Sequence, residues 1–566
     1  MGYIEKQNRG QLTFLPDCVE EYIGEDNPAR VIDAFVDSLD LSALGFKRAV
    51  PDETGRPPYD PRDLLKLYLY GYFNRIRSSR RLMAECERNV ELFYLMGKLR
   101  PDFRTIADFR KENAKALKGV FRAFVSLCMK LGLYQRELFA VDGTRIRAVN
   151  GKDHAFNAEV LEKKLARIEE NLTEYLRRLD SADVLESPSG EPSGEEIRAA
   201  VADLRARRTK YEGYLEYLKT SGETQILGTD PEARRMHSKD GFHCCYNVQT
   251  AVDEGSHLVA DYAVTNHNTD QGLLHSVAEG VKEALGLEVV HTVADKGYDS
   301  RQDILSCVMN GVVPNVGFKY DKTERVFPLE HIEAMPTQEE RRSTRPADIQ
   351  KCLHAGVLPD CYEGTGLSVE LQYKTQMSCF LLQKDGTVMC PHGHILRRTR
   401  QRGANAIYAN KGACRECQNR CTASKSYKTV SFGPNTDCIP VVMYGECATP
   451  VNRIPPDARI SPYNHVLDRK SCACKQKVLL TIREDKEKQR LRMCLSEHPF
   501  GTVKWHHGAH YLLCKGKEKA GGEMGLSFLC YNLRRVLNMV GASALIAGIR
   551  EGILPNESPK TVKAGA

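Results

Sequence analysis

The sequence predicts a multidomain α/β protein whose core is a mixed β-sheet, preceded by a helical domain and interrupted by two insertions. A chain of 566 residues is too long for one compact core, so several domains are expected. Apolar residues recur at helical spacing through the first 135 residues, whereas short strand-like runs and helices alternate between residues 138 and 316. A long cysteine-rich stretch follows these runs.

Residues 1–135 are predicted to form an N-terminal helical domain that binds DNA. Asn27-Pro28 and Asp60-Pro61 each place a capping side chain before a proline, which is typical of a helix start. A third helix is predicted from about Ile106 to Leu131. Between the second and third helices lies the basic segment RIRSSRR, at residues 75–81.

The basic segment suggests how this domain would contact DNA. A small helical domain with clustered arginines is typical of proteins that read the end of a duplex. We therefore predict that Arg77, Arg80 and Arg81 contact DNA. The alternative is a scaffold domain whose arginines face solvent. The net charge of +7 suits an anionic partner but does not identify one.

The first part of the core is predicted at residues 136–319. Three strands, a helix, a strand, a helix and a strand follow one another, at residues 138–146, 246–252, 257–264, 270–286, 288–294, from about 301, and 311–316. This order of elements is that of a ribonuclease-H-like sheet. Residues from about 152 to 225 interrupt it. There, apolar residues spaced by three and four from Leu161 to Leu179 and from Ile197 to Leu218 predict an antiparallel helical hairpin.

Residues 320–480 are predicted to be a second, cysteine-rich insertion. The chain has 20 cysteines and no apolar signal-peptide core, so metal binding explains them better than disulfides. A close CxxC pair with two flanking cysteines suits a structural zinc ion. The predicted ligands are Cys390, Cys414, Cys417 and Cys421, with His392, His394, Cys472 and Cys474 as alternatives. A reduced, partly buried cysteine cluster is the competing interpretation.

Two aspartates stand where predicted strands end. Asp142 precedes Gly143-Thr144, and Asp295 precedes Lys296-Gly297. Adjacent strand ends would bring the two carboxylates together, and such a pair repels itself unless cations lie between its members. Two Mg²⁺ or Mn²⁺ ions on carboxylates would solve this problem and support phosphodiester chemistry. Each aspartate alone is more typical of a turn, and Asp270 and Asp299 are expected to cap helices.

A third acid is expected from residues 481–550, the C-terminal helical part of the core; residues 551–566 are a tail. Glu497 lies five residues after Arg492 and seven before Lys504, so basic side chains could reach a phosphate held near its carboxylate. Pro499 should end or kink the helix just beyond it. Glu523 is therefore a rival for the third acid.

These pieces together resemble the DDE transposases of bacterial insertion sequences, in the branch with an InsH-like N-terminal domain. The matching stretches are YDPRDLLKLYLYGY, PDFRTIADFRKEN, AVDGTRIRA, YNVQTAVD, VADKGYDS, EHPFGTVK and YNLRR, spread from about residue 59 to residue 535. The resemblance implies a metal-binding catalytic triad of Asp142, Asp295 and Glu497, with Lys504 completing a Glu-x6-Lys pattern. Arg492 stands one residue earlier than this pattern expects, and Gln489 occupies a tyrosine position.

The resemblance also implies an activity and partners. Such an enzyme cleaves double-stranded DNA at the element's terminal repeats and joins the freed 3′-hydroxyls to target DNA, as a homodimer or larger assembly. Alternatives are a ribonuclease-H-like nuclease that does not join ends and an inactive, element-derived DNA-binding protein. No apolar stretch approaches the roughly 20 residues of a membrane helix. We therefore expect a cytoplasmic protein that associates with the nucleoid when it acts.

Overall fold

The computed structural model divides the chain into two compact units. One comprises Met1–Asp303 and Glu487–Ala566, and the other comprises Ile304–Lys486. The described residues are 18–51, 57–151, 155–182, 194–238, 241–319, 323–374, 380–382, 387–390, 393–403, 405–417, 422, 426–432, 440–442, 448–450 and 475–551. Each unit is a mixture of helices and strands, which confirms the predicted α/β class.

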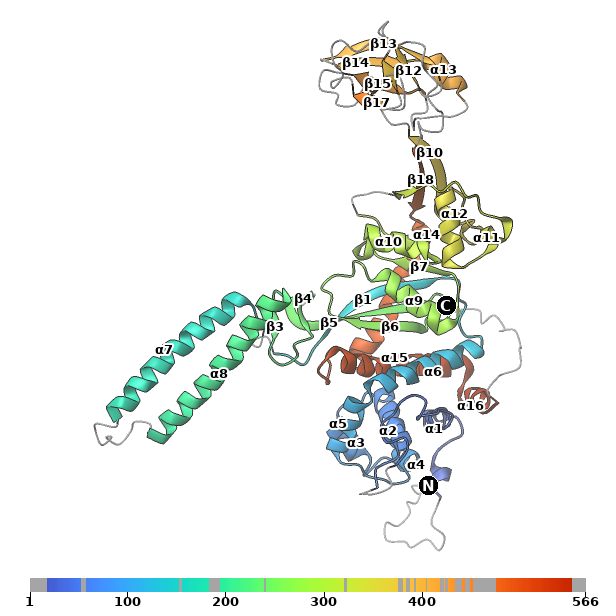
Figure 1. The fold of residues 1–566 in the computed structure, drawn as a ribbon. Helices are drawn as coiled ribbons and strands as arrows, with labels where there is room; N and C mark the ends of the chain where they lie inside the picture. Colours follow the sequence, from blue (N-terminus) through green and yellow to red (C-terminus); the bar gives the residue numbers. More distant parts are fainter. Residues whose placement is uncertain are drawn as a thin grey trace, which may run out of the picture. The chain divides into compact units, whose positions relative to one another are not determined.

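The first unit begins with a short 3₁₀ turn and a set of helices (Figure 1). They are η1 (Val19–Tyr22), α1 (Pro28–Asp37), α2 (Pro61–Phe73), α3 (Ser79–Glu85), α4 (Val90–Met96), α5 (Phe103–Glu112) and α6 (Ala114–Lys130). Asn27 and Asp60 cap α1 and α2 by accepting hydrogen bonds from the backbone N–H two residues on, and a proline follows each. The sequence signals for these helix starts are therefore confirmed.

A mixed sheet forms the centre of the first unit. Its strands are β1 (Phe139–Arg147), β4 (Arg234–Ser238), β5 (Gly241–Asp253), β6 (Val259–Thr265) and β7 (Val290–Ala294). Strand β1 lies between β5, which is antiparallel to it, and β7, which is parallel. Both β4 and β6 pair with β5 in antiparallel register. Helix α9 (Leu274–Leu285) covers part of this sheet, and α10 (Arg301–Met309) follows the 3₁₀ turn η3 (Lys296–Tyr298).

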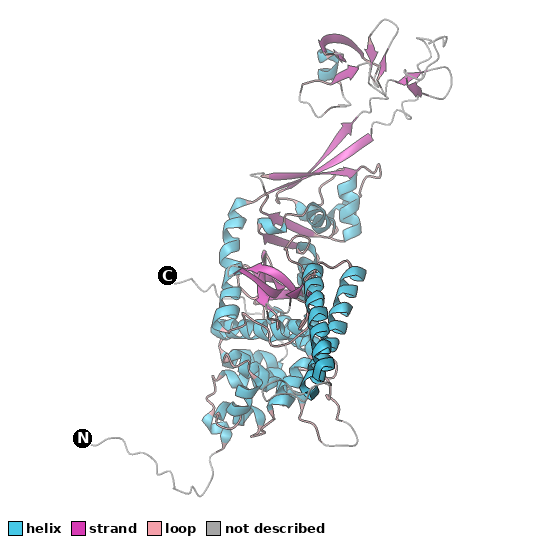
Figure 2. Cartoon of the chain, turned by 90° about the vertical axis from the view of Figure 1, so that its left-hand side faces the viewer, coloured by secondary structure: helices cyan, strands magenta, loops and turns pink. Residues whose placement is uncertain are grey.

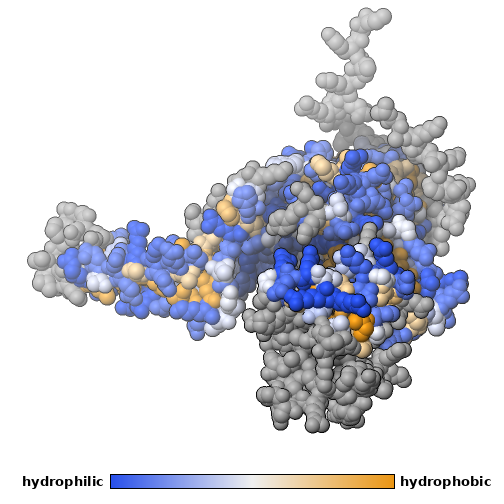
Figure 3. Space-filling view, turned by 90° about the horizontal axis from the view of Figure 1, so that it is seen from above, coloured by the Kyte–Doolittle hydropathy of each residue, from blue (hydrophilic) through white to orange (hydrophobic). Residues whose placement is uncertain are grey.

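A long helical hairpin separates β1 from β4 along the chain. Helices α7 (Ala158–Ala182) and α8 (Gly194–Ser221) lie along one another, between the short paired strands β2 (Ala155–Phe156) and β3 (Ile226–Leu227). Ile168, Leu172, Ile197 and Val201 form a buried seam between the two helices. The visible face of the hairpin, on the left of Figure 3, is otherwise mostly hydrophilic. Two helices with one apolar stripe each bury it against each other.

The C-terminal helices return to the first unit. They are α14 (Lys486–Gly501), the π-helical turn η7 (Thr502–His506), α15 (Lys517–Val540) and α16 (Ala542–Glu551). Helix α15 lies beside α6 (Figure 1). Asn532 on α15 accepts from Val259 N (2.9 Å) and donates to Val259 O (2.8 Å), which ties this helix to β6. The packing of α15 thus joins the N-terminal helices to the sheet.

The second unit contains two larger sheets, and Figure 2 shows strands as the main element of its cysteine-rich part. The first sheet has the order β10 (Leu367–Lys374), β18 (Lys475–Arg483), β9 (Glu324–Glu330). The second comprises β11 (Leu381–Leu382), β12 (Val388–Met389), β13 (Ile395–Arg402), β14 (Asn405–Ala409) and β15 (Thr429–Phe432). The remaining elements are β8 (Val312–Val316), α11 (Gln338–Arg342), α12 (Pro346–Ala355), η4 (Asp360–Tyr362), α13 (Lys411–Glu416), β16 (Pro440–Val442) and β17 (Ala448–Pro450).

Candidate active site

Asp142 and Asp295 stand at the same level of two neighbouring parallel strands. The register of β1 with β7 pairs Val141 with Ala294, so the next residue on each strand is one of the two aspartates. Side chains at matching positions of adjacent strands are close neighbours, because strands lie about 4.8 Å apart.

Asp142 is a largely buried carboxylate with few protein partners. Its Oδ1 accepts from the backbone N–H of Gly143 at 2.8 Å, and Arg492 Nη1 lies 3.5 Å from its Oδ2. Burial is the main cause that raises the pKa of Asp142, and the negative charge of Asp295 adds to it. The Ser496 hydroxyl and the Gly143 backbone N–H, and then the charge of Arg492, oppose the rise. A bound cation would stabilise the ionised carboxylate and so offset both the burial and the repulsion from Asp295. This environment therefore favours a positively charged ligand.

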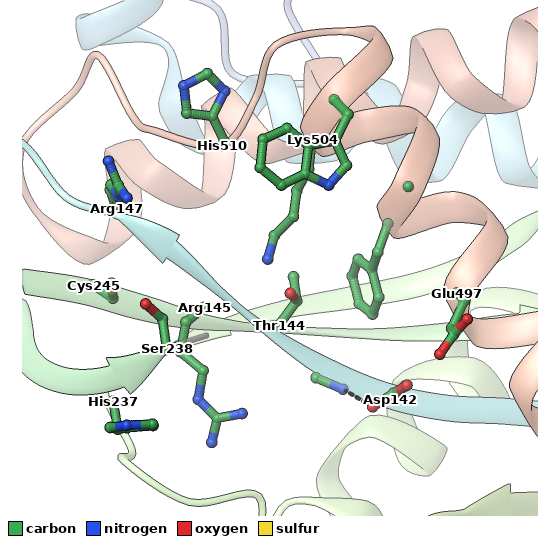
Figure 4. A pocket seen from close by; sticks show the side chains of 14 residues that line it. Asp142, Thr144, Arg145, Arg147, His237, Ser238, Cys245, Glu497, Lys504 and His510 are labelled. Carbon is green, nitrogen blue, oxygen red and sulfur yellow. Dashed lines mark hydrogen bonds between the residues drawn. The ribbon is translucent and has the colours of Figure 1, made fainter. Parts of the chain in front are cut away.

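Glu497 faces Asp142 from a different element. It projects from α14, and Figure 4 shows the two carboxylates pointing toward one another across one end of a cleft. Two contacts of α14 fix this position. Leu495 packs in a buried cluster with residues of β1 and β7, and Gln489 Nε2 donates to Ala294 O at 3.0 Å. Gln489, which replaces an expected tyrosine, therefore holds the helix against the strand that ends at Asp295.

Of the two outcomes expected at Pro499, an end of the helix or a kink, the helix end does not occur. Helix α14 continues to Gly501 and passes directly into the π-helical turn η7, in which His507 N donates to Thr502 O at 2.9 Å. Proline lacks a backbone N–H and so removes one helical hydrogen bond, and the chain then continues in a wider turn with i to i+5 hydrogen bonds. The turn carries Lys504 into the wall of the same cleft that Asp142 and Glu497 line.

The cleft is large and its wall is basic. Its volume is about 930 Å³, and the cationic and imidazole side chains that line it are Arg145, Arg147, His237, Lys504 and His510. Figure 4 shows these groups along the cleft, away from the carboxylate end. Sequence reasoning missed Arg145 and Arg147. Their signal was present in the motif DGTRIR, where basic residues follow the first acid at alternate positions of a strand.

Gly143 and Asp270 form a tight polar layer beside Asp142. A Cβ atom on Gly143 would lie 2.6 Å from Asp270 Oδ1 and closer still to Gln249 Nε2, so any larger residue would displace these two side chains. Asp270 does not cap α9, contrary to expectation, since that helix begins at Leu274 with Asp303 accepting from its first N–H groups. Asp270 instead accepts from Gln249 at 2.8 Å and lies 3.3 Å from Arg145.

Glu523, the rival for the third acid, is engaged elsewhere. Its side chain is 0% exposed and lies 2.6 Å from Arg77 Nη2. It also accepts from the backbone N–H groups of Leu513 and Cys514, at 2.9 and 3.0 Å. Arg77 itself is 7% exposed, so both charges are satisfied inside the protein. Neither residue lines the cleft that holds Asp142.

The donor chemistry of the cleft fits a hard divalent cation, because carboxylate oxygens are what Mg²⁺ and Mn²⁺ prefer. Asp142 and Glu497 line the cleft, whereas Asp295 Oδ1 accepts from Gly297 N at 2.7 Å at the adjoining strand end. Within the described ranges, no three histidine, cysteine or acidic side chains stand close enough together to hold a metal ion. Asp142 and Glu497 thus face each other, and Asp295 lies at the end of the neighbouring strand β7.

Two family matches bear on this geometry. Residues 17–112 match the family described as Transposase domain (DUF772), and residues 203–533, more than half of the chain, match the family described as Transposase DDE domain. The chain belongs to the DDE transposase family. No curated protein and no solved structure matches it. Transposases of this family act on DNA and in general depend on divalent metal ions.

The matched ranges divide the candidate residues of this transposase. Asp295, Glu497 and Lys504 lie inside the DDE match, and Asp142 lies in the interval between the two matches. The arginines Arg80 and Arg81 lie in the N-terminal match and are exposed, with the Arg80 guanidinium stacked 4.2 Å from the Phe103 ring centroid. Across the described residues, no helix is long and apolar enough to span a bilayer.

Three of the predicted zinc ligands border one cavity in the cysteine-rich part of the transposase, but among the described residues they do not form a three-ligand metal cluster. Cys390, Cys414 and Cys417 line one small cavity together with His394. A tight turn surrounds Cys390, whose Sγ accepts from His394 N at 3.3 Å. Cys421, His392, Cys472 and Cys474 lie outside the described residues.

Proposed function

We propose that this transposase cleaves DNA at the ends of its element by metal-dependent phosphodiester hydrolysis and joins the freed 3′-hydroxyls to target DNA. One observation carries the proposal. Asp142 and Glu497 face each other at one end of a basic cleft, next to the strand end that bears Asp295. Binding of a DNA strand requires basic side chains along its phosphates. Cleavage by metal ions also requires carboxylates that hold these ions at the reacting phosphate.

In this proposal each residue has a defined task. Asp142, Asp295 and Glu497 would hold two Mg²⁺ or Mn²⁺ ions, which supply an activated water or 3′-hydroxyl and stabilise the leaving oxygen. Lys504 would bind the phosphate beside the cleaved bond, because it lies on the same cleft wall. Arg492 stands 3.5 Å from Asp142 and is placed to neutralise negative charge on the phosphate that enters.

We also propose that the core of this transposase is ribonuclease-H-like. Three antiparallel strands, β1, β5 and β6, with β7 parallel to β1, support this arrangement in the first unit. The acids then lie on β1, directly after β7, and on helix α14. We propose further that the enzyme acts as a dimer or larger assembly, since two element ends must be joined together.

The experiment is cleavage of a labelled, supercoiled plasmid that carries the element's own ends, with Mg²⁺ or Mn²⁺. Asp142→Asn, Asp295→Asn and Glu497→Gln should bind the ends but not nick them. Glu523→Gln is the matched control, because that carboxylate is buried against Arg77 rather than in the cleft. Normal nicking by all three acid variants would overturn the assignment.

A nuclease without joining activity is the second candidate function, and it differs in one readout. Wild-type protein given a precleaved end with a free 3′-hydroxyl should form strand-transfer product. Hydrolysis without such product would favour the nuclease. Binding without any metal-dependent cutting would favour an inactive, element-derived DNA-binding protein.

We propose a structural zinc ion for the cysteine cavity, with Cys390, Cys414, Cys417 and Cys421 as ligands. Support comes from the shared cavity and from the N–H···S hydrogen bond at Cys390, since thiolates bound to zinc accept such bonds. Elemental analysis should find one zinc per chain, and Cys390→Ser should lose it. Cys494→Ser, at an exposed cysteine on α14, should retain it. A metal-free wild type would contradict the proposal.

A further inference from the structure

A second cleft lies on the other side of the α14–η7 segment. Its volume is about 590 Å³, and its lining includes His498, Thr502, His506, Arg534 and Arg535. The two arginines belong to the motif YNLRR on α15, for which the active-site cleft gives no role. Gly501 and Trp505 line both clefts, so the two are adjacent.

The second cleft carries positive charge without balancing carboxylates. Arg75, on the turn after α2, contacts His506 and adds a further cation at this site. Within the part of the chain that the structure describes, no ion pair involves Arg75, Arg534 or Arg535. Burial and the charge of Arg535 lower the pKa of nearby His257, and Asp253 only partly opposes this. Asp253 itself accepts from the backbone N–H groups of Arg136 and Ser256.

The arginines of the cleft are held in place by neutral partners. Arg534 donates to Phe73 O at 2.6 Å and stacks 4.1 Å from the Phe73 ring centroid, while its buried Nε has no hydrogen-bond partner. Arg535 donates to Ser256 O at 2.9 Å. Fixed guanidinium groups that keep donors unused are preorganised for an anion with several acceptor oxygens.

The titration of neighbouring groups agrees with this excess of positive charge. Burial, followed by the charge of Arg75, lowers the pKa of Arg534. Burial, Arg534, His506 and Arg75 lower the pKa of His507 to about 4. Like charges contribute to these shifts, and an anion in the cleft would oppose that contribution.

We propose that this second cleft binds a phosphodiester of the DNA backbone, on a strand that continues from the active-site cleft across η7. The proposal rests on the proposed function, since it requires DNA in the first cleft. A backbone phosphate supplies the anionic oxygens that the guanidinium groups lack, and the shared wall at Gly501 and Trp505 gives the strand a continuous path. The YNLRR motif would then position DNA rather than take part in catalysis.

The test measures binding of a labelled element end without divalent metal, over a series of salt concentrations. Arg75→Gln is the first variant, because Arg75 is exposed and contacts only His506 among the hydrogen bonds described. It should weaken binding about tenfold, as expected for the loss of one charge-assisted hydrogen bond. It should also reduce the slope of log K against log salt by about 0.9. Arg75→Lys should restore the slope.

A second variant and a matched control distinguish a local contact in the cleft from a general effect of net charge on DNA binding. Asn538→Asp adds negative charge at an exposed residue of the cleft and should weaken binding similarly. Lys517→Gln removes one charge from the same helix, about 27 Å from Arg535 at 1.5 Å per residue, and should have a smaller effect. Equal effects of Arg75→Gln and Lys517→Gln would overturn the proposal.

A chemical probe locates the contact on the DNA. Single neutral methylphosphonates placed along the end should weaken wild-type binding at one position, and Arg75→Gln should be insensitive at that position. If inorganic phosphate at constant ionic strength competes as well as DNA does, the cleft is a small-anion site and the proposal fails. Failure of the proposed function is distinct, because wild type would then fail to nick the element ends in the presence of divalent metal, whether or not it binds them.

Discussion

Glu497 and Glu523 carry the same carboxylate on successive helices, yet the structure uses them in opposite ways. Glu497 is exposed and faces Asp142 across an open, basic cleft. Glu523 is fully buried, paired with Arg77 and bonded to two backbone N–H groups. A buried carboxylate must be satisfied by protein, whereas an exposed one keeps its oxygens available for a ligand. The comparison separates a structural acid from a candidate catalytic one.

The largest expected effect concerns the acids of the cleft. Glu497→Gln and Asp142→Asn should reduce plasmid nicking by about 10³-fold, the upper end for loss of one preorganised electrostatic group. The thermal midpoint of Glu497→Gln should stay near that of wild type, because its side chain is exposed. A nicking rate within about threefold of wild type would remove Glu497 from the catalytic assignment.

The buried pair should respond in stability. Glu523→Gln leaves Arg77 as an uncompensated buried charge, which costs about 3 kcal/mol. The free energy of unfolding, measured in urea for the cooperative transition of the first unit, should fall accordingly. Arg77→Met combined with Glu523→Leu should recover much of the loss, because no unpaired charge remains. If Glu523→Gln is as stable as wild type, the ion pair between Arg77 and Glu523 does not contribute to the free energy of unfolding.

A smaller effect is expected at Gly143. The added Cβ of Gly143→Ala would collide with Gln249 and Asp270, so unfolding free energy should fall by about 1–3 kcal/mol. Nicking should fall as well, because Asp142 must shift. Gly213→Ala on α8 is the control. A Cβ atom added to Gly213 would meet no atom within 4 Å, and alanine should stabilise that helix by up to about 1 kcal/mol.

The pKa of Asp142 gives the subtlest test. Its folded-state pKa is raised by burial and by Asp295, so its ionised form opposes folding. Asp142→Asn should therefore be more stable than wild type at neutral pH. This advantage should shrink as the pH falls through the folded-state pKa and vanish below the unfolded-state pKa. Chemical unfolding at a series of pH values measures it, and a variant less stable than wild type at neutral pH would contradict burial and Asp295 as the cause.

Much of the local structure could be predicted from the sequence. The caps at Asn27 and Asp60, and the helical spacing over residues 161–179 and 197–218, depend on neighbours within a few turns, and the structure has helices at these places. Asp295 follows the end of β7 as expected, whereas Asp142 lies within β1, which continues to Arg147, so the strand end expected near Asp142 is wrong. Asp270 was misread as a cap, because the bonds it accepts come from Gln249, Asn247 and Arg145, which lie on other elements.

The sequence by itself determined the mixed α/β class, the family and the short set of acids from which a triad could be chosen. Only the tertiary structure decided which glutamate is available. Both are ordinary helical residues in the sequence, and the difference arises from Arg77, which approaches Glu523 from 446 residues away. Burial and long-range pairing depend on how elements pack, and local sequence does not encode them. The second cleft, which the arginines of the YNLRR motif line, arises in the same way, from residues that come together only in the folded chain.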